Sequence, residues 1–249
     1  MKKIICGNWK MNKNRQEAID LVSEIEANLP ETENEVVVFP PFPYLEAVKN
    51  AAKKLKVGAQ NCFWEEKGAF TGEVSPRQVK EFADYVLVGH SERRGYLNET
   101  NNMINQKIKA AIDVNLTPIL CVGENLAQRD SGETEAILTE KILEGLKGLG
   151  KEYLGKIIIA YEPIWSISTT QNRKDCTAID ADDASKLIKK IVKDKFLEAG
   201  EIKVFFGGNI NPQNAQAYLT SKEYDGGLVG GASLDANSFL EVIRQAEPI

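Results

Sequence analysis

The chain has 249 residues, of which 43% are hydrophobic and 27% charged, and its 31 Lys and Arg against 36 Asp and Glu give a net charge of −5. This composition fits a folded globular chain and excludes disordered, collagenous and coiled-coil proteins. The acidic balance gives no sign of a nucleic-acid partner or of binding to an acidic membrane surface.

Short apolar runs rich in β-branched residues recur along the chain and are bounded by Gly, Asn and Pro. They lie at residues 3–8, 35–40, 56–61, 85–90, 117–122, 156–161, 203–208 and 226–231. Most are continuous rather than alternating, which is typical of parallel strands that are covered on both faces. We therefore expect eight strands of a parallel sheet.

Segments with helical periodicity separate these runs. The clearest is 14–29, which carries apolar residues on one face and begins with Asn14 and Glu17 at the spacing of a capping box. A similar pattern covers 180–196, behind a run of aspartates. The weaker candidates are 43–55, 75–83, 101–113, 133–148, 211–220 and 235–245.

Strand and helix thus alternate eight times, and the strands begin on average about every 32 residues, the size of one βα unit. Eight such units predict an α/β protein whose residues 1–249 form a single-domain (β/α)8 barrel. An open doubly wound sheet is the alternative. It usually carries a glycine-rich dinucleotide fingerprint after the first strand, and GNWKMN is not one.

The histidine and cysteine counts exclude several kinds of site. One histidine cannot supply a metal site that needs two, and four scattered cysteines form no C-x-x-C pair. We expect no metal, no cofactor and free thiols. No apolar run has the length of a signal-peptide core or a membrane span, so we expect a cytoplasmic protein without a membrane partner.

Polar side chains stand where the predicted strands end, which is where such a barrel places its active site. Asn8 and Lys10 stand at the end of the first strand, His90 at the end of the fourth and Glu162 at the end of the sixth. A carboxylate base and a neutral electrophile favour abstraction of a proton beside a carbonyl. A Schiff base on Lys10 is the alternative, but it is not needed when Glu162 and His90 are present.

Glycine pairs follow the last two strands, at 207–208 and 230–231. Glycines let backbone N–H groups approach an anion, and the segment from Gly231 to Asp235 is a candidate helix start. We therefore expect a phosphorylated ligand.

Several strings of the chain resemble the triosephosphate isomerase family over its full length: GNWKMN, PPFPYL, GAQN, GAFTGEVS, VGHSERR, PILCVGE, AYEPIW and LVGGASL. The resemblance implies a TIM barrel without a cofactor. It also implies interconversion of dihydroxyacetone phosphate and D-glyceraldehyde 3-phosphate through an enediolate, in glycolysis and gluconeogenesis.

By this resemblance the catalytic residues are Lys10, His90 and Glu162. Glu162 is the base, and Lys10 supplies positive charge. His90 polarises the carbonyl as a neutral imidazole, because the positive end of the helix that begins at Ser91 disfavours the imidazolium. Asn8 is expected to hydrogen-bond the substrate.

The resemblance further implies supporting and phosphate-binding residues. Glu92 holds Lys10, and Cys121 lies near the base. The remaining substrate-binding residues, after Asn8 and Lys10, are Ser168, Asn209, Gly230 and Gly231.

The GAFTGE stretch around Thr71 resembles the loop that in this family reaches the partner subunit beside its Lys10. The resemblance therefore implies a homodimer. A structural loop in a monomer is the alternative.

The chain departs from the family pattern after the sixth and seventh strands. The segment 165–175 lacks the two glycines of the family's WAIGTGKTA lid, and the family's YGGS is Phe206-Gly207-Gly208-Asn209 here. The change at Phe206 removes a hydroxyl that ties down the closed lid in relatives. We expect weaker closure, entry of water and more loss of phosphate from the enediolate.

Two other functions remain open at this point. An altered lid is compatible with an isomerase of a four-carbon ketose phosphate. A phosphate-ligand sensor that has lost turnover is also compatible, although binding alone does not require a base.

Overall fold

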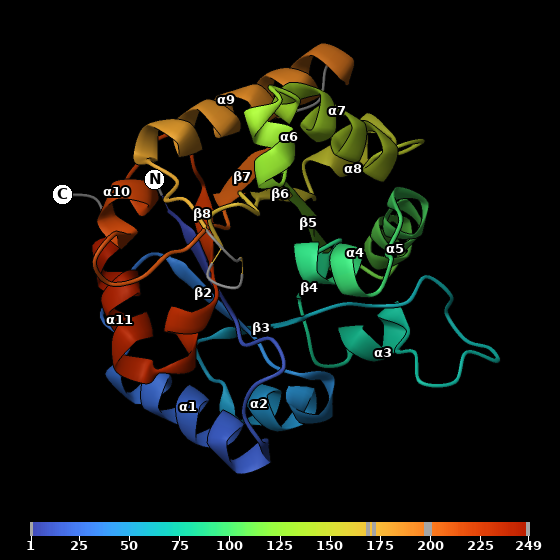
Figure 1. Cartoon of the computed structure of the whole chain (residues 1–249). Coiled ribbons are helices and arrows are strands. Elements are labelled where there is room, and N and C mark those ends of the chain that lie inside the picture. Colours follow the sequence, from blue (N-terminus) through green and yellow to red (C-terminus); the bar gives the residue numbers. More distant parts are fainter. Residues whose placement is uncertain (1, 168–169, 171–172, 197–200, 248–249) are drawn as a thin grey trace.

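The eight predicted strands close into a parallel barrel in the computed structural model, which describes residues 2–167, 170, 173–196 and 201–247 (Figure 1). Neighbours in sequence are neighbours in the barrel, and β8 returns to pair with β1. The strands are β1 Ile4–Asn8, β2 Glu35–Phe39, β3 Lys56–Ala59, β4 Tyr85–Val88, β5 Thr117–Val122, β6 Ile158–Tyr161, β7 Lys203–Phe206 and β8 Gly226–Val229. The expected α/β TIM barrel is therefore confirmed.

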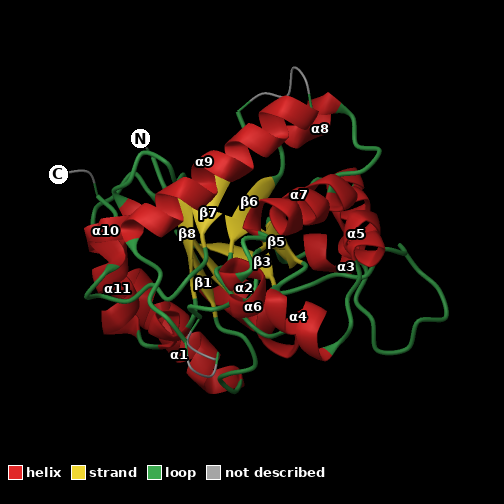
Figure 2. Cartoon of the chain, turned by 45° about the horizontal axis from the view of Figure 1, so that its top comes forward, coloured by secondary structure: helices red, strands yellow, loops and turns green. Residues whose placement is uncertain are grey.

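Helices surround the strands as an outer layer (Figure 2). None of those described combines the length and hydropathy that a membrane span needs. The α-helices are α1 Arg15–Asn28, α2 Leu45–Ala51, α3 Pro76–Lys80, α4 Ser91–Tyr96, α5 Asn101–Asp113, α6 Leu126–Asp130, α7 Thr134–Gly145, α8 Lys151–Leu154, α9 Ala178–Lys195, α10 Ala215–Leu219 and α11 Ala236–Gln245. Two 3-10 helices, η1 Phe42–Tyr44 and η2 Gly231–Leu234, complete the described elements.

Most strand residues are apolar because both faces of the strands are buried, and polar residues stand mainly at strand ends, such as Lys56 in β3 and Lys203 in β7. In β1, Ile4 and Cys6 belong to the cluster inside the barrel, whereas Ile5 belongs to the cluster beneath the helices. The interior is filled by side chains and forms no pore. Its buried members are Ile4, Cys6, Val37, Phe39, Leu87, Ile119, Cys121, Ile158, Ala160, Phe205 and Leu228.

The predicted start of α1 is confirmed by its capping chemistry, whereas α9 starts two residues before the predicted 180, behind a capping box of Thr177 and Asp180. Asn14 and Glu17 form the expected capping box, with the Glu17 N–H donating to the Asn14 side chain. Two short helices, α6 and α8, were not predicted, because five or fewer residues show little periodicity. Helix α10 starts four residues later than predicted, after Pro212.

Strands β2, β3, β4, β7 and β8 end one or two residues earlier than predicted, and at β4 this shapes the site. The fourth was expected to reach residue 90, but β4 ends at Val88 and Gly89 takes a φ of +73°. This left-handed conformation turns the chain, so His90 is the N-cap of α4 and not a strand residue.

Candidate active site

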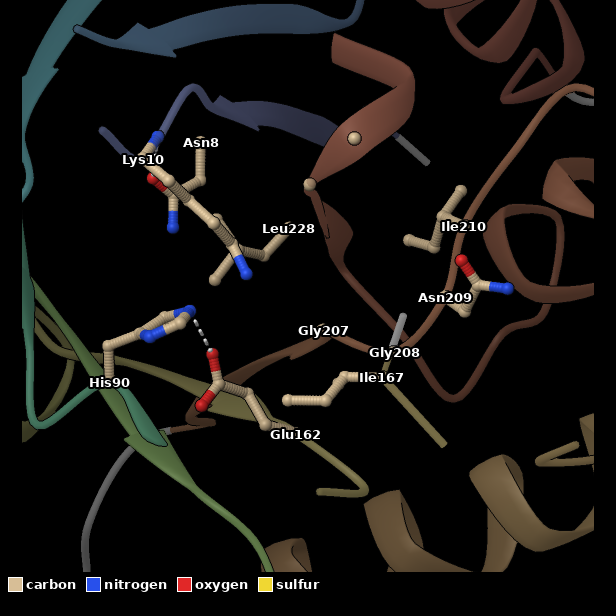
Figure 3. A pocket seen from close by; sticks show the side chains of 12 residues that line it. Asn8, Lys10, His90, Glu162, Ile167, Gly207, Gly208, Asn209, Ile210 and Leu228 are labelled. Atoms are coloured by element: carbon tan, nitrogen blue, oxygen red, sulfur yellow. Dashed lines mark hydrogen bonds and ion pairs between the residues drawn. The ribbon is translucent and has the colours of Figure 1, made fainter. Parts of the chain in front are cut away.

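One pocket at the carboxyl end of the barrel brings together most of the predicted site residues (Figure 3). Ser168 lies outside the described residues, and Glu92 and Cys121 stand beside the pocket and do not line it. The lining residues are Asn8, Lys10, His90, Glu162, Ile167, Gly207, Gly208, Asn209, Ile210, Leu228, Gly230 and Gly231.

Glu162 and His90 face one another across this pocket (Figure 3). Glu162 Oε1 lies 3.0 Å from His90 Nε2, and Glu162 Oε2 accepts a 3.0 Å hydrogen bond from the Ser91 N–H. Both side chains are buried, Glu162 to 3% exposure. The pair thus places a carboxylate against an imidazole where little water can reach.

His90 is oriented by the first turn of α4. The Glu92 backbone N–H donates to His90 Nδ1 at 3.3 Å, while the nearest carboxylate oxygen of Glu92 lies 3.7 Å from the same atom, too far for a hydrogen bond. A nitrogen that accepts from a backbone N–H carries no proton. The imidazole proton therefore belongs on Nε2, the atom that contacts Glu162.

Lys10 is held in an uncommon backbone conformation, with a φ of +52°. Its N–H donates to Asn8 Oδ1 at 3.0 Å, and its carbonyl accepts from Gln60 Nε2 at 2.8 Å. The ammonium pairs with Glu92 Oε1 at 2.5 Å. A strained backbone conformation persists only where surrounding hydrogen bonds hold it, and such conformations are common at functional sites.

Gln60 was not among the predicted site residues, although GAQN was noted as a motif. Its amide also donates to the Phe39 carbonyl, so it links the ends of β1 and β2. Nothing in the residue type distinguishes such an amide from an exposed one, and only its position in the barrel reveals its role.

Cys121 lies inside the barrel, next to Glu162. Burial raises the pKa of its thiol well above the usual range, and the neighbouring Glu162 carboxylate raises it further. The thiol therefore stays protonated at neutral pH and is a packing neighbour of Glu162.

Glycines and backbone line the opposite side of the pocket. Gly230 lies close to the Lys10 side chain, and a Cβ added at Gly231 would meet open space. Asn209 lies on this side, away from His90 (Figure 3). The expected helix start at Gly231 is the 3-10 turn η2, and the α-helix itself begins at Ala236, capped by Asp235.

The described residues at the base of the lid segment are tied together. The Phe206 ring stacks on Tyr218 with centroids 4.3 Å apart, and the Tyr218 hydroxyl donates to the Cys176 carbonyl. The Cys176 N–H donates to Ser166 Oγ at 3.0 Å. Phe206 has no hydroxyl, but Tyr218, which stacks on it, hydrogen-bonds the backbone just after the lid segment. Weaker closure of the lid stays a prediction.

The chain is similar to known proteins over nearly its whole length. The sequence profile described as triosephosphate isomerase matches residues 3–246. The triosephosphate isomerase of Dictyoglomus turgidum is 44% identical over 249 residues, covering 98% of this chain and 99% of that protein. The one from Clostridium botulinum is 44% identical over 246 residues, covering 97% of this chain and 98% of that protein.

A solved structure agrees. The crystal structure of triosephosphate isomerase from Bartonella henselae has a TM-score of 0.86 with 31% identity, covering 98% of this chain and 99% of that one. The sequence matches and the structural match therefore agree with the residues found in the pocket. The chain belongs to the triosephosphate isomerase family.

Proposed function

We propose that the chain interconverts dihydroxyacetone phosphate and D-glyceraldehyde 3-phosphate, with Glu162 as the base that moves a proton between neighbouring carbons. The activity is that of the family to which the chain belongs; the proposal lies in the roles of its residues. One observation carries it: a buried carboxylate contacts an imidazole in a pocket that also holds Lys10. A base, a neutral hydrogen-bond donor and a cation are what an enediolate requires.

His90 polarises the substrate carbonyl through its Nε2–H. Nε2 cannot donate to Glu162 and to a substrate oxygen at the same time. Binding of the substrate therefore displaces the Glu162 carboxylate from Nε2, which frees it to approach the substrate carbon. Enediolate charge then develops beside a donor that is already oriented by α4.

Lys10 and Asn8 complete the polar side of the site. Lys10 supplies positive charge to the enediolate and the phosphate, and Glu92 holds its ammonium in place. Asn8, 5% exposed, hydrogen-bonds the substrate oxygens while its side chain braces the Lys10 backbone. Cys121 supports Glu162 by packing.

The phosphate binds on the glycine side, at the backbone N–H groups of Gly230 and Gly231, with Asn209 as a further donor. Glycines in this position leave room for an anion against the backbone.

Coupled assays on glyceraldehyde 3-phosphate and on a tetrulose phosphate, with Glu162→Gln as the control, test the proposal. We expect turnover of the three-carbon substrate and a kcat about 10³-fold lower in Glu162→Gln, because an amide cannot take the proton. A preference for the tetrulose phosphate would identify the four-carbon isomerase instead, and no turnover of either would leave a phosphate-ligand sensor. Both outcomes contradict the proposal.

The proton position on His90 has its own test. His90 is the one histidine of the chain, so its ring nitrogens are identified directly by nitrogen NMR. At about pH 7 we expect a protonated Nε2 and an unprotonated Nδ1. A ring protonated on both nitrogens would contradict the role given to it.

We also propose a homodimer in which the loop around Thr71 enters the partner beside its Lys10. The loop between β3 and α3 projects from the body of the chain (Figures 1 and 2). Phe70 on this loop is 42% exposed, and Met11 and Tyr96, which line a groove next to Lys10, are 95% and 79% exposed. An apolar loop tip and an apolar groove complement one another.

Sedimentation of Phe70→Asp tests the dimer. We expect dissociation to monomers and loss of most activity, because a charge at the loop tip cannot enter an apolar groove. Ile179→Asp, which alters an exposed apolar residue on α9, is the matched control and should stay dimeric. A monomeric unmodified protein, or a dimeric Phe70→Asp variant, would contradict the proposal.

We place the enzyme in the cytoplasm. Its four cysteines are free and buried, as expected where disulfides do not form. The family's reaction belongs to glycolysis. Cell fractionation with detection of the chain is the direct test.

A further inference from the structure

Four consecutive backbone carbonyls at the end of β5 have an unusual set of partners. The carbonyl of Val122 accepts from the Glu162 N–H at 2.7 Å, and that of Glu124 accepts from the Ile164 N–H at 3.1 Å. The backbone of the base is thus hydrogen-bonded directly to this segment. The two remaining carbonyls, of Cys121 and Gly123, do not bind β6 in this way and are taken by side-chain cations.

Arg94 and Lys141 are these cations. Arg94 Nη2 donates to the Cys121 carbonyl at 3.2 Å, and Lys141 Nζ donates to the Gly123 carbonyl at 2.5 Å. Arg94 comes from α4, the helix that orients His90, whereas Lys141 comes from α7 in the outer layer. The segment that carries the base is therefore held from two helices.

Gly123 is in direct contact with the backbone of the base. A Cβ built on Gly123 would lie 1.7 Å from the Glu162 carbonyl oxygen and 3.3 Å from its Cα. No side chain separates the segment that follows β5 from the segment that follows β6 at this point, so a shift of Gly123 is transmitted to Glu162. The Gly123 carbonyl itself accepts from Lys141 Nζ.

A cation at this position is costly to the fold. Burial is the main cause that lowers the Lys141 pKa to about 8, and the Arg94 charge lowers it further; Glu162, Glu124 and Glu140 oppose the shift. An apolar side chain of similar volume would avoid this desolvation penalty. Folding stability alone does not account for the lysine.

We propose that Lys141 is a positioning residue for proton transfer: its ammonium binds the Gly123 carbonyl and thereby fixes the segment against which the backbone of the base Glu162 rests. The inference depends on Glu162 being the base. A carboxylate that abstracts a proton must be held to within fractions of an ångström, and small displacements cost rate rather than substrate affinity.

Steady-state kinetics of Lys141 variants test the inference. We expect Lys141→Met, which keeps the volume and loses the donor, to lower kcat about 10-fold with KM changed less than about twofold. Lys141→Arg, which retains a cationic donor, should recover most of the loss. Lys147→Met removes an exposed lysine just beyond α7 and should leave kcat unchanged.

The pH dependence of kcat distinguishes an effect of the Lys141 charge from an effect of side-chain packing. We expect kcat of the unmodified enzyme to fall about threefold between about pH 7 and 9.5 as Lys141 loses its proton, and that of Lys141→Arg to stay flat, because arginine keeps its charge. An equal fall in Lys141→Arg would overturn the inference.

Two further outcomes would overturn it. One is a kcat in Lys141→Met within about twofold of the unmodified enzyme, or a loss confined to KM. The other applies if Lys141→Met does not fold. In that case the inference is overturned if Lys141→Gln, which has a neutral donor, and Lys141→Arg have equal kcat values. Failure of the proposed base is recognised separately, because Glu162→Gln would then keep its activity.

Discussion

The two sides of the pocket are built by opposite means. On the side proposed for proton transfer, His90 and Glu162 are buried side chains, each bonded to a backbone N–H of α4. On the proposed phosphate side, the wall contains four glycines beside Asn209 and Ile210, with open space at Gly231. Proton transfer needs atoms fixed in place, whereas anion binding needs exposed N–H groups and room. Changes on the first side should alter kcat, and changes on the second should alter KM.

Among variants that keep both His90 and Glu162, the largest effect is expected for Gly123→Ala. The new methyl group would overlap the Glu162 carbonyl oxygen, so the base must move, and a displacement of about 1 Å costs about 100-fold in rate. Gly155→Ala is the control, because a Cβ there meets nothing within 4 Å. Measured kcat values decide the matter. A loss confined to KM would break the contrast between the two sides.

The pH dependence of stability comes next in size. The folded-state pKa of Lys141 is lowered from 10.5 to about 8, mainly by burial. Below about pH 8 the lysine is charged in both states, and between about 8 and 10.5 the unfolded chain keeps a proton that the folded chain releases, so stability rises with pH.

Relative to Lys141→Met, the unmodified protein should therefore gain about 2 kcal/mol between pH 7 and about pH 9.5. Urea unfolding of both proteins at equal concentration measures this difference and cancels the contribution of the other groups. A constant difference across this range would show that the lysine is not desolvated in solution.

A smaller effect is expected for Gly231→Ala on the phosphate side. Its Cβ meets no protein atom, so the free energy of unfolding should stay within about 0.5 kcal/mol of the unmodified value. The methyl group occupies space at the phosphate site, and KM should rise about tenfold with kcat little changed. If kcat falls and KM does not, the glycine side also positions reacting atoms.

The smallest effect is expected for Tyr218→Phe at the base of the lid segment. It removes the hydroxyl that bonds the Cys176 carbonyl, at a cost of about 1 kcal/mol in the free energy of unfolding. Release of inorganic phosphate per isomerisation should rise about threefold as water enters. Tyr153→Phe on α8 is the matched control. Unchanged phosphate release would show that the hydrogen bond between Tyr218 and the Cys176 carbonyl does not contribute to closure of the lid.

Local patterns in the sequence were sufficient to predict the barrel and to name the polar residues that its pocket brings together. Parallel strands buried on both faces must be continuously apolar, as in β4 and β5, and a barrel gathers the residues after its strands at one end. Asn8, Lys10, His90 and Glu162 could therefore be named before their distances were known.

The tertiary structure alone decided how these groups are held. Gln60, Arg94 and Lys141 are ordinary polar residues in the sequence, and their partners are backbone carbonyls 50, 27 and 18 positions away. A backbone carbonyl is the same at every residue, so no residue type marks which one a side chain binds. Periodicity reports which face of an element is buried, whereas the position of Glu162 depends on contacts between elements that only folding brings together.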